Sequence, residues 1–329
     1  MDIVKNIYIT GGAGYVGAML VPALLEAGYK VTVLDLMIYG DGVLSPHPNL
    51  KIIQGDLRDI DLLNQSIVGH DAVIHLACIS NDPSFELNPD LGRSINLDAF
   101  EPLVKASKFF GVKRFVYASS SSVYGIKEDK DVNETMTLEP LTDYSRFKAD
   151  CEEILAKYQS PQFTTTTIRP ATVCGYSRRQ RLDVVVNILT NLAFHKREIT
   201  VFGGSQLRPN IHIADMVDVY LAILSAPKDK VAGEIFNAGT ENLSVLELAQ
   251  TVKKIMGQDV KLVSTPTNDN RSYHISSKKI AEKIGFVSKH SIAEAVQDLK
   301  FALEQGLLKD SLSDARYFNI KTMQSINLK

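Results

Sequence analysis

A chain of 329 residues is long enough for one large α/β domain with a smaller lobe. Its hydrophobic fraction of 45% and charged fraction of 22% are ordinary for a globular protein, which excludes a disordered chain and a fibrous repeat. The formal net charge of −2 gives no general attraction to nucleic acid or to an anionic membrane, so we expect neither as a partner.

The cysteines and the N-terminus indicate a reducing compartment. Cys78, Cys151 and Cys174 lie far apart and form no C-x-x-C pair, so we expect reduced thiols and no metal site. The first residues run directly into an expected strand, without the basic and apolar segments of a secretory signal. No apolar run approaches the ~20 residues of a membrane-spanning helix. We therefore expect a cytoplasmic protein.

The first half of the sequence alternates short β-branched runs with helix-like segments. Strands are expected at residues 6–10, 30–34, 51–54, 72–76, 114–118 and 163–168, and helices at residues 15–27, 90–110 and 143–159. Strands without strict alternation of apolar and polar residues, followed by helices, are typical of a parallel sheet covered on both faces. The pattern predicts a doubly wound Rossmann fold of the α/β class.

After about residue 175 the pattern is less regular. Helices are expected at residues 184–195, 214–225, 245–256 and 292–304, with isolated short strands between them. We expect residues 1–175 to form the Rossmann domain, joined by strands and helices from later segments. Residues 176–329 should form mainly a smaller α/β lobe at the carboxyl edge of the sheet. Residues 306–329 are polar and irregular, and we expect a tail or a peripheral wrap.

A glycine-rich turn, G-G-A-G-Y-V-G at residues 11–17, joins the first expected strand to the first expected helix. Glycines let the backbone approach a pyrophosphate, whose charge meets the free amides at the helix N-terminus. Asp35 closes the next strand at about the spacing of the acid that binds the adenine ribose. This carboxylate would repel a 2′-phosphate, and residues 36–39 contain no Arg or Lys, so NAD is favoured over NADP. A glycine-rich turn without a ligand is the alternative.

A tyrosine and a lysine form a candidate catalytic pair. Tyr144 and Lys148 stand at i and i+4 and so face the same way on a helix. An ammonium beside a phenol favours the phenolate, which makes the tyrosine a candidate proton acceptor. The pair follows S-S-S-S-V-Y-G at residues 119–125, directly after an expected strand, and strand ends of this kind converge on a ligand crevice. The same spacing at Tyr317 and Lys321 is interpreted as accidental, because that copy lies in the expected tail.

These motifs, with D-L at residues 56–57 and H-L-A at residues 75–77, are similar to those of the extended short-chain dehydrogenase/reductase family, of the NAD-dependent nucleotide-sugar epimerase/dehydratase type. The resemblance covers nearly the whole chain. It implies that Ser120 binds the substrate oxygen, Tyr144 acts as acid and base, and Lys148 holds the nicotinamide ribose and promotes ionisation of the tyrosine. Their ordinary alternatives are a serine that caps a strand and a lysine that is a solvated charge.

The resemblance also assigns binding residues. Contacts with NAD are expected from Gly11, Gly14, Tyr15, Val16, Gly17, Asp35, Asp56, Leu57, Leu76, Ala77, Tyr144 and Lys148. Contacts with a nucleotide-diphosphate sugar are expected from Ser120, Ser121, Asp183, Val184, Arg208 and Arg271. Two guanidiniums that fork onto phosphate oxygens suit such a substrate. The basic run of Arg178, Arg179 and Arg181 is equally consistent with phosphate binding and with a solvated surface, and His75 and His212 are interpreted as structural.

Several positions bear on the reaction. A 4,6-dehydratase of this family carries Asp-Glu where this chain has Ser121 and Ser122, so dehydration is disfavoured. A reductase/3,5-epimerase would have a cysteine and a decarboxylase a glutamate at the second position. Cys78 and Cys174 stand where an alanine and a tyrosine are commoner, which could alter the pocket.

The economical reaction is therefore a 4-epimerisation by transient oxidation at C4. The alternatives are a C4 dehydrogenase that forms a 4-keto sugar and a non-catalytic NAD-binding regulator. Family members commonly dimerise through the two long helices, here residues 90–110 and 143–159, so a homodimer or a dimer-based oligomer is expected.

Overall fold

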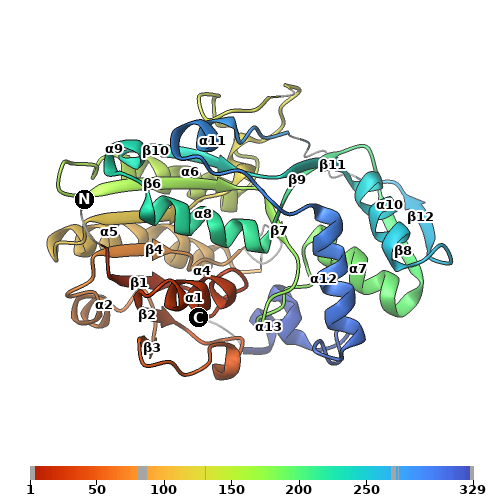
Figure 1. Cartoon of the computed structure of the whole chain (residues 1–329), viewed down its shortest axis with the longest axis horizontal. Helices are drawn as coiled ribbons and strands as arrows, with labels where there is room; N and C mark the ends of the chain where they lie inside the picture. The colour runs from red at the N-terminus through yellow and green to blue at the C-terminus, as the bar shows by residue number, and fades with distance from the viewer. Residues whose placement is uncertain (1–3, 81–86, 130, 268–271, 273, 327–329) are drawn as a thin grey trace.

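The computed structural model describes residues 4–80, 87–129, 131–267, 272 and 274–326. A seven-stranded parallel sheet forms its centre, in the order β10-β6-β5-β4-β1-β2-β3 (Figure 1). The strands are β1 (Asn6–Thr10), β2 (Lys30–Asp35), β3 (Leu50–Gln54), β4 (Ala72–His75), β5 (Arg114–Ala118), β6 (Thr164–Pro170) and β10 (Glu234–Ala238). The predicted doubly wound Rossmann fold is confirmed. The strand order reverses at β1, between β2 and β4, where a sheet of this kind opens a crevice at its carboxyl edge.

Helices cover both faces of this sheet. Alternate residues of β1 point to opposite faces, so Ile7 and Ile9 join one core and Tyr8 joins the other. The first core includes residues of α1 (Gly17–Glu26) and α8 (Ile213–Ser225), and the second includes residues of α2 (Ile60–Ser66), α5 (Phe100–Phe109) and α6 (Asp143–Ala156). Each large side chain buried in this way stabilises the fold by about 1.5–3 kcal/mol. This burial on both faces explains why the strands lack simple alternation.

The helix expected at residues 90–110 is interrupted. The structure has α4 (Pro89–Arg93), a π-helical turn η2 (Ser94–Asp98) and then α5. Within this turn, the buried Asn96 side chain accepts a hydrogen bond from Ile79 N at 2.8 Å and donates one to Ile79 O at 3.0 Å. The expectation of one regular helix was wrong, because these bonds to the segment after β4 hold the bulged turn in place.

The later half of the chain forms two small sheets and a cluster of helices beside the main sheet. The first sheet has β7 (Thr172–Cys174), β9 (Leu207–His212) and β11 (Glu241–Ser244), and the second has β8 (Glu198–Phe202) and β12 (Lys261–Thr265). Three helices pack together there: α7 (Val185–Lys196), α10 (Val245–Met256) and α12 (Ile292–Glu304). Strand β10 and helix α8 instead belong to the main sheet and its cover. The chain therefore returns to the Rossmann unit after entering the smaller lobe.

Several short helical segments complete the described chain. They are η1 (Asp41–Val43), η3 (Ser121–Tyr124), α9 (Lys228–Val231), α11 (Lys278–Ile284), η4 (Ala315–Tyr317) and α13 (Asn319–Ile326). The expectation of an irregular tail after residue 306 was wrong for η4 and α13. The backbone N–H of Asn319 donates to the carboxylate of Asp183 at 2.9 Å, so a residue of the smaller lobe satisfies the start of α13. No local pattern in the tail carries that partner.

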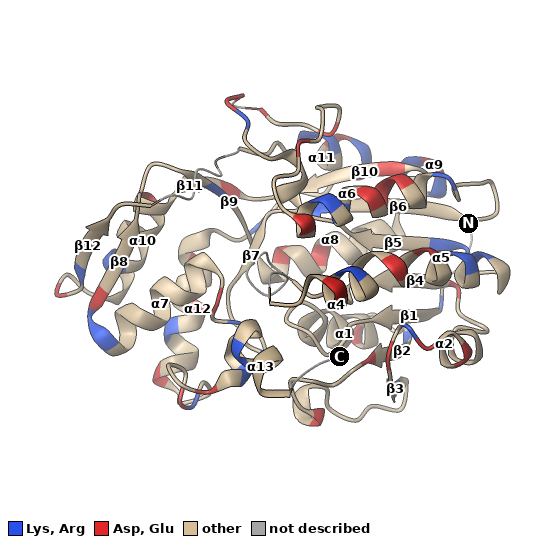
Figure 2. Cartoon of the chain, turned by 180° about the vertical axis from the view of Figure 1, so that it is seen from behind, with Lys and Arg blue, Asp and Glu red and all other residues tan. Residues whose placement is uncertain are grey.

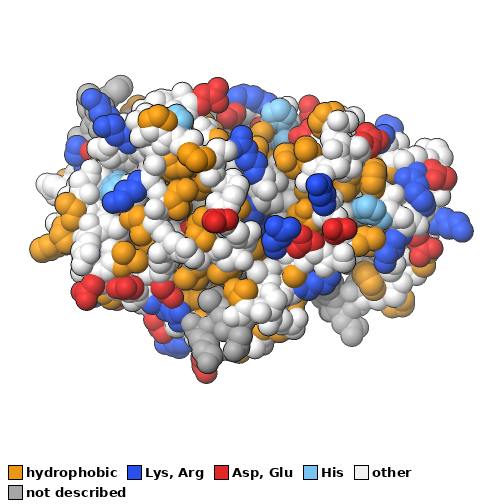
Figure 3. All heavy atoms as spheres, turned by 90° about the horizontal axis from the view of Figure 1, so that it is seen from below, with side chains coloured by type: hydrophobic (Ala, Val, Ile, Leu, Met, Phe, Trp, Pro, Cys, Tyr) orange, Lys and Arg blue, Asp and Glu red, His pale blue; other side chains and the backbone are white. Residues whose placement is uncertain are grey.

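Charged side chains of both signs cover the surface, and the helices are short or polar. On the face shown in Figure 3, cationic and anionic side chains are interspersed. Charges of both signs also follow α4, α5 and α6 (Figure 2). Within the described ranges, every helix is too short or too polar to cross a bilayer.

A buried histidine at the end of β4 makes the fold sensitive to acid. His75 is 2% exposed, its Nδ1 shares a hydrogen bond of 2.7 Å with the Thr10 hydroxyl, and its ring stacks on Tyr117. Burial, assisted by the charge of Lys148, lowers the pKa of His75 to about 3. Below the ordinary histidine pKa, the unfolded chain therefore binds a proton that the folded chain does not.

We predict that protonation of His75 in the unfolded chain lowers the free energy of unfolding by roughly 2 kcal/mol as the pH falls from about 6.5 to about 5. This contribution to stability is complete above the unfolded-state pKa and is lost as the pH falls towards the folded-state pKa. Urea unfolding at about pH 7.5 and about pH 5 gives the change in the free energy of unfolding with pH. The change should be larger for the wild type than for His75→Gln, and the difference is the contribution of His75. His47→Gln changes an exposed histidine and should keep the wild-type pH dependence. The same pH dependence in His75→Gln would contradict the prediction.

Candidate functional site

The glycine-rich turn after β1 faces a cavity of about 460 Å³. Gly11 has φ +77°, and a Cβ at this position would meet the backbone of Ala77, which follows β4. A Cβ at Gly17 would strike the carbonyl oxygen of Gly12. Helix α1 begins here with no side-chain cap and no acidic residue in its first turn. Ala18 N, Met19 N and Leu20 N donate to Gly14 O or Val16 O, so the N–H groups of residues 15–17 are the ones left for an anion. This cradle fits the pyrophosphate of a dinucleotide.

Asp35 closes β2 beside the turn. Its carboxylate accepts hydrogen bonds from Ala13 N at 2.9 Å and Met37 N at 2.8 Å. Burial raises the pKa of Asp35, and these two N–H groups and Arg179 oppose that effect. Each oxygen keeps a further acceptor position, so the carboxylate is fixed and can still accept a ribose hydroxyl.

The acid after β3 has a partner of its own. Gly55 N donates to Asp35 O, which places Asp56 and the buried Leu57 next to the end of β2. The Arg58 guanidinium donates to the Asp56 carboxylate from Nε at 3.0 and 3.1 Å and from Nη2 at 2.6 Å. Burial acts to raise the pKa of Asp56, but the bonds from Arg58 outweigh it and lower the pKa. Of the expected contacts with NAD on these segments, Leu76 lines the cavity. The others lie beside the cavity and do not line it: Asp35, Asp56, Leu57 and Ala77.

The three expected catalytic residues line the same cavity. Ser120 is the N-cap of η3, and its Oγ accepts the Ser122 N–H at 3.1 Å and lies 2.9 Å from the Ser122 hydroxyl. Tyr144 and Lys148 project from the first two turns of α6. The Lys148 ammonium donates to Ala118 O at 2.6 Å and lies 5.8 Å from the centre of the Tyr144 ring. The tyrosine, the lysine and the serine therefore share one wall.

Helix α6 is positioned by its first residues and by a buried ion pair. Thr142 and Ser145 cap its N-terminus reciprocally, which places the candidate pair, Tyr144 and Lys148, directly after the start of the helix. Two turns later, Glu152 contacts Arg169 of β6 at 2.6 Å, with both side chains almost fully buried. Glu152 also accepts from the Ser119 hydroxyl at the end of β5. These contacts fix α6 to the strand ends beneath the cavity.

The smaller lobe supplies the opposite wall. Arg208 of β9 and Val184, which precedes α7, line the cavity together with Ser121 of η3. Asp183 lines it as well, but its carboxylate is held by Arg181 at 2.6 Å. Arg271, the second expected phosphate-binding arginine, lies outside the described residues.

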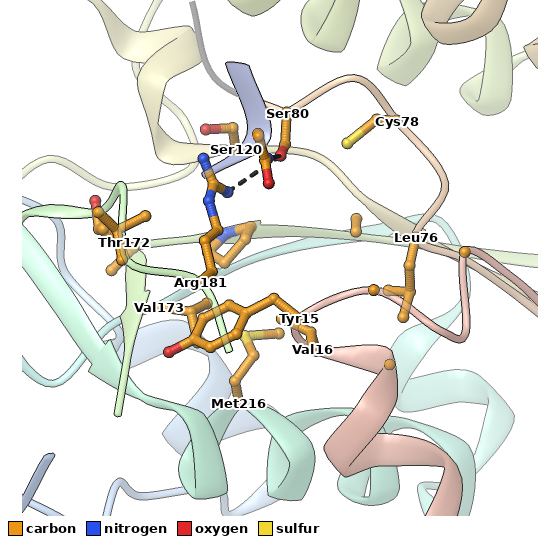
Figure 4. A pocket seen from close by; sticks show the side chains of 18 of the residues that line it. Tyr15, Val16, Leu76, Cys78, Ser80, Ser120, Thr172, Val173, Arg181 and Met216 are labelled. Carbon is orange, nitrogen blue, oxygen red and sulfur yellow. Dashed lines mark hydrogen bonds between the residues drawn. The ribbon is translucent and has the colours of Figure 1, made fainter. Parts of the chain in front are cut away.

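The three arginines of the basic run point in different ways. Arg178 is exposed and lies 3.4 Å from the Ser45 hydroxyl, whereas Arg179 and Arg181 line the cavity. Figure 4 shows Arg181 reaching between Tyr15 and Ser80, and its Nη1 donates to the Ser80 hydroxyl at 3.1 Å. The run is therefore not one solvated surface.

Sequence reasoning missed part of the wall. Further lining residues are Tyr39, Ser80, Thr172, Val173, Met216, Tyr220 and Asn319. Ser80 follows the H-L-A motif closely and could have been found from it. Asn319 comes from the expected tail, and no nearby motif points to it. Of the two unusual cysteines, Cys78 lines the cavity, whereas Cys174 is buried outside it.

Neither singled-out histidine offers a ligand site. His212 accepts the Ala214 N–H at 3.1 Å through Nδ1, and its Nε2 lies 3.1 Å from an Asp298 oxygen. His75 is buried with its Thr10 partner. In the part of the chain that the structure describes, no three His, Cys, Asp or Glu side chains are grouped as a metal site.

The chain is similar in sequence and in structure to known proteins. The model of the NAD dependent epimerase/dehydratase family matches residues 7–239. The UDP-glucose 4-epimerase of Lactobacillus helveticus is 27% identical over 312 residues, 88% of this chain and 94% of that protein. The dTDP-D-glucose 4,6-dehydratase of Bos taurus is 30% identical over 299 residues, covering 84% and 82%. The solved structure of MoeE5 in complex with UDP-glucose and NAD matches with a TM-score of 0.80 and 26% identity, covering 92% of this chain and 100% of that one.

The buried ion pair beneath the cavity gives a prediction about stability. Replacing Glu152 by Gln leaves the Arg169 guanidinium buried without its carboxylate, and we expect a loss of about 3–5 kcal/mol from the free energy of unfolding. Urea unfolding near neutral pH measures this loss. Glu153→Gln changes the adjacent, exposed glutamate and should stay within about 0.5 kcal/mol of the wild type. Equal stability of the two variants would mean that the pair does not hold α6.

Proposed function

The chain belongs to the NAD-dependent epimerase/dehydratase family of enzymes, and on this premise we propose that it is a 4-epimerase of nucleotide-diphosphate sugars. One observation carries the proposal. Ser120, Tyr144 and Lys148 share a cavity with the glycine-rich turn, and the described residues that line it include a single carboxylate, Asp183, which is already paired with Arg181. Among the described lining residues, Tyr144 is thus the candidate acid and base, and no unpaired carboxylate is present to assist a second step such as the elimination of water.

Tyr144 would remove the proton of the sugar 4-hydroxyl and later return it. The Lys148 ammonium beside its ring favours the phenolate, because the two charges attract in a partly dry cavity. Ser120 can donate a hydrogen bond to the same sugar oxygen, since its own oxygen is held by Ser122. Bound NAD supplies the acceptor and donor of hydride at C4.

The two halves of the cavity would divide the binding. We assign NAD to the Rossmann unit, residues 1–175 with β10 and α8, through the glycine-rich turn, Asp35 and the segments after β3 and β4. The smaller lobe would bind the nucleotide-diphosphate sugar, with Arg208 on the diphosphate. Asp183 and Val184 lie where the lobe begins α7, and Arg181 neutralises the repulsion that Asp183 would exert on a phosphate.

The alternatives differ in the groups that they need. Eliminating water to form a 4,6-dehydrated sugar requires an additional acid and base, and the positions beside Ser120 carry only the hydroxyls of Ser121 and Ser122. A C4 dehydrogenase would use the same residues and release a 4-keto sugar. A non-catalytic regulator has no need for Ser120, Tyr144 and Lys148 to lie together.

We also propose a homodimer through α5 and α6. These helices pack side by side on one face of the sheet, and Phe109 at the end of α5 is 82% exposed. Analytical ultracentrifugation checks this state. A single monomeric species at micromolar concentration would exclude it.

The decisive assay is incubation with UDP-, GDP-, CDP- and dTDP-sugars, with products identified by NMR and the reduced cofactor followed by absorbance. The expected result is a C4 epimer without net reduction of the cofactor. A lasting 4-keto sugar with reduced cofactor would establish the dehydrogenase, and a 6-deoxy-4-keto sugar the dehydratase. Absence of turnover with every sugar in the panel would favour the regulator.

The acid/base assignment gives a second prediction. Tyr144→Phe removes one hydroxyl, and we expect kcat to fall by about 10²- to 10⁴-fold with little change in NAD binding. Tyr317→Phe removes the hydroxyl of the other Y-x-x-x-K copy, which does not line the cavity, and should keep wild-type activity. Undiminished turnover in Tyr144→Phe would overturn the assignment.

A further inference from the structure

Arg179 is a cation buried in the cavity wall without a carboxylate partner. Its side chain lines the cavity, and the residue is only 4% exposed. Its Nε makes no hydrogen bond, and its Nη2 donates to Asn319 Oδ1 at 2.5 Å. Within the described ranges, no Asp or Glu lies within ion-pair distance of it. A buried guanidinium with an unused N–H is costly for the fold unless an anion meets it.

The guanidinium is held in one orientation before any ligand arrives. Its carbon lies 3.4 Å from the centre of the Tyr39 ring, which is a stacked cation–π contact. The Tyr39 hydroxyl donates to the same Asn319 oxygen at 3.0 Å. The ring fixes the plane of the guanidinium and Asn319 fixes its rotation, so binding an anion would cost little ordering of this side chain.

The backbone on either side of Arg179 is tied to the glycine-rich turn. The Tyr15 hydroxyl donates to Gly175 O at 2.7 Å, and the Ser177 hydroxyl donates to Tyr15 O at 2.8 Å. Asn187 Nδ2 donates to the Tyr15 hydroxyl at 3.0 Å and to Arg181 O at 2.7 Å. The segment that carries Arg179 is therefore held against the turn that cradles a pyrophosphate.

Charge distinguishes this arginine from its neighbours. Arg181 is neutralised by Asp183, and Arg178 is exposed. Arg179 lies close enough to Asp35 for its charge to oppose the effect of burial on the pKa of that acid. It therefore lies near both the acid that can bind the adenine ribose and the glycine-rich turn.

We propose that Arg179 binds the diphosphate of NAD, from the wall that faces the glycine-rich turn. An N–H of its guanidinium that faces the cavity would donate a charge-assisted hydrogen bond to a phosphate oxygen, which supplies the anion that the buried guanidinium lacks. A 2′-phosphate is a poorer occupant, because Asp35 would repel it. This assignment rests on the NAD dependence of the family and not on the sugar reaction proposed above.

The test is titration calorimetry of the full chain with NAD, ADP and adenosine. Arg179→Met keeps the length of the side chain and removes the charge, and we expect NAD and ADP to bind about 10- to 100-fold more weakly. Adenosine, which has no phosphate, should be unaffected. Arg178→Met removes the adjacent exposed charge and should bind all three ligands as the wild type does.

Arg179→Lys keeps the charge and tests the proposal if the methionine variant does not fold. Lysine lacks the fork of N–H donors but keeps the positive charge. The preference for ADP over adenosine should therefore fall by a smaller factor than it does in Arg179→Met. Equal weakening of ADP and adenosine would reduce Arg179 to a structural role and overturn the proposal. UDP and 2′,5′-ADP are titrated in parallel. A loss confined to UDP would place the arginine at the sugar nucleotide, and a loss confined to 2′,5′-ADP would place it at a 2′-phosphate, and either result would overturn the proposal. Ligand binding requires no turnover, so these results stand whether or not the protein epimerises a sugar.

Discussion

The buried ion pair between Glu152 and Arg169 is the constraint on which the cavity wall formed by α6 depends. Two charges removed from water are tolerated because each neutralises the other and neighbouring hydroxyls complete their hydrogen bonds. Lys148 stands one helical turn before Glu152, so the place of the guanidinium in β6 decides where the ammonium lies. The site thus relies on a pair that does not line the cavity.

The cavity lies between two walls that differ in chemistry. The Rossmann wall contributes backbone N–H groups, small residues and a fixed carboxylate, which suit a dinucleotide. The wall from the smaller lobe contributes guanidiniums, which suit phosphate groups. Since β10 and α8 return to the Rossmann unit after the lobe has begun, the chain crosses between the walls more than once. Their spacing is consequently set by the whole fold and not by one linker.

Features that depend on local sequence could be predicted, and features that depend on distant partners could not. The parallel strands, the glycine-rich turn and the start of α6 follow from runs of neighbouring residues, and the structure has them. The π-helical turn at Ser94–Asp98 depends on bonds from Asn96 to a segment after β4. Helix α13 depends on Asp183, which lies 136 residues earlier in the chain. Arg178 is exposed, whereas Arg179 is buried against the Tyr39 ring and the Asn319 amide. These partners lie far away in the sequence, so a run of like charges could not reveal the difference.

The place of Asn319 in the cavity wall has a consequence for biosynthesis. Synthesis runs from the N-terminus, so the last strand of the central sheet, β10, is made before the amide of Asn319, which follows Arg179 by 140 residues and Tyr39 by 280. A nascent chain can therefore fold its central sheet well before its cavity is complete. The cavity wall is therefore complete only once Asn319 has been made and has reached Tyr39 and Arg179, two residues from which the linear sequence separates it widely.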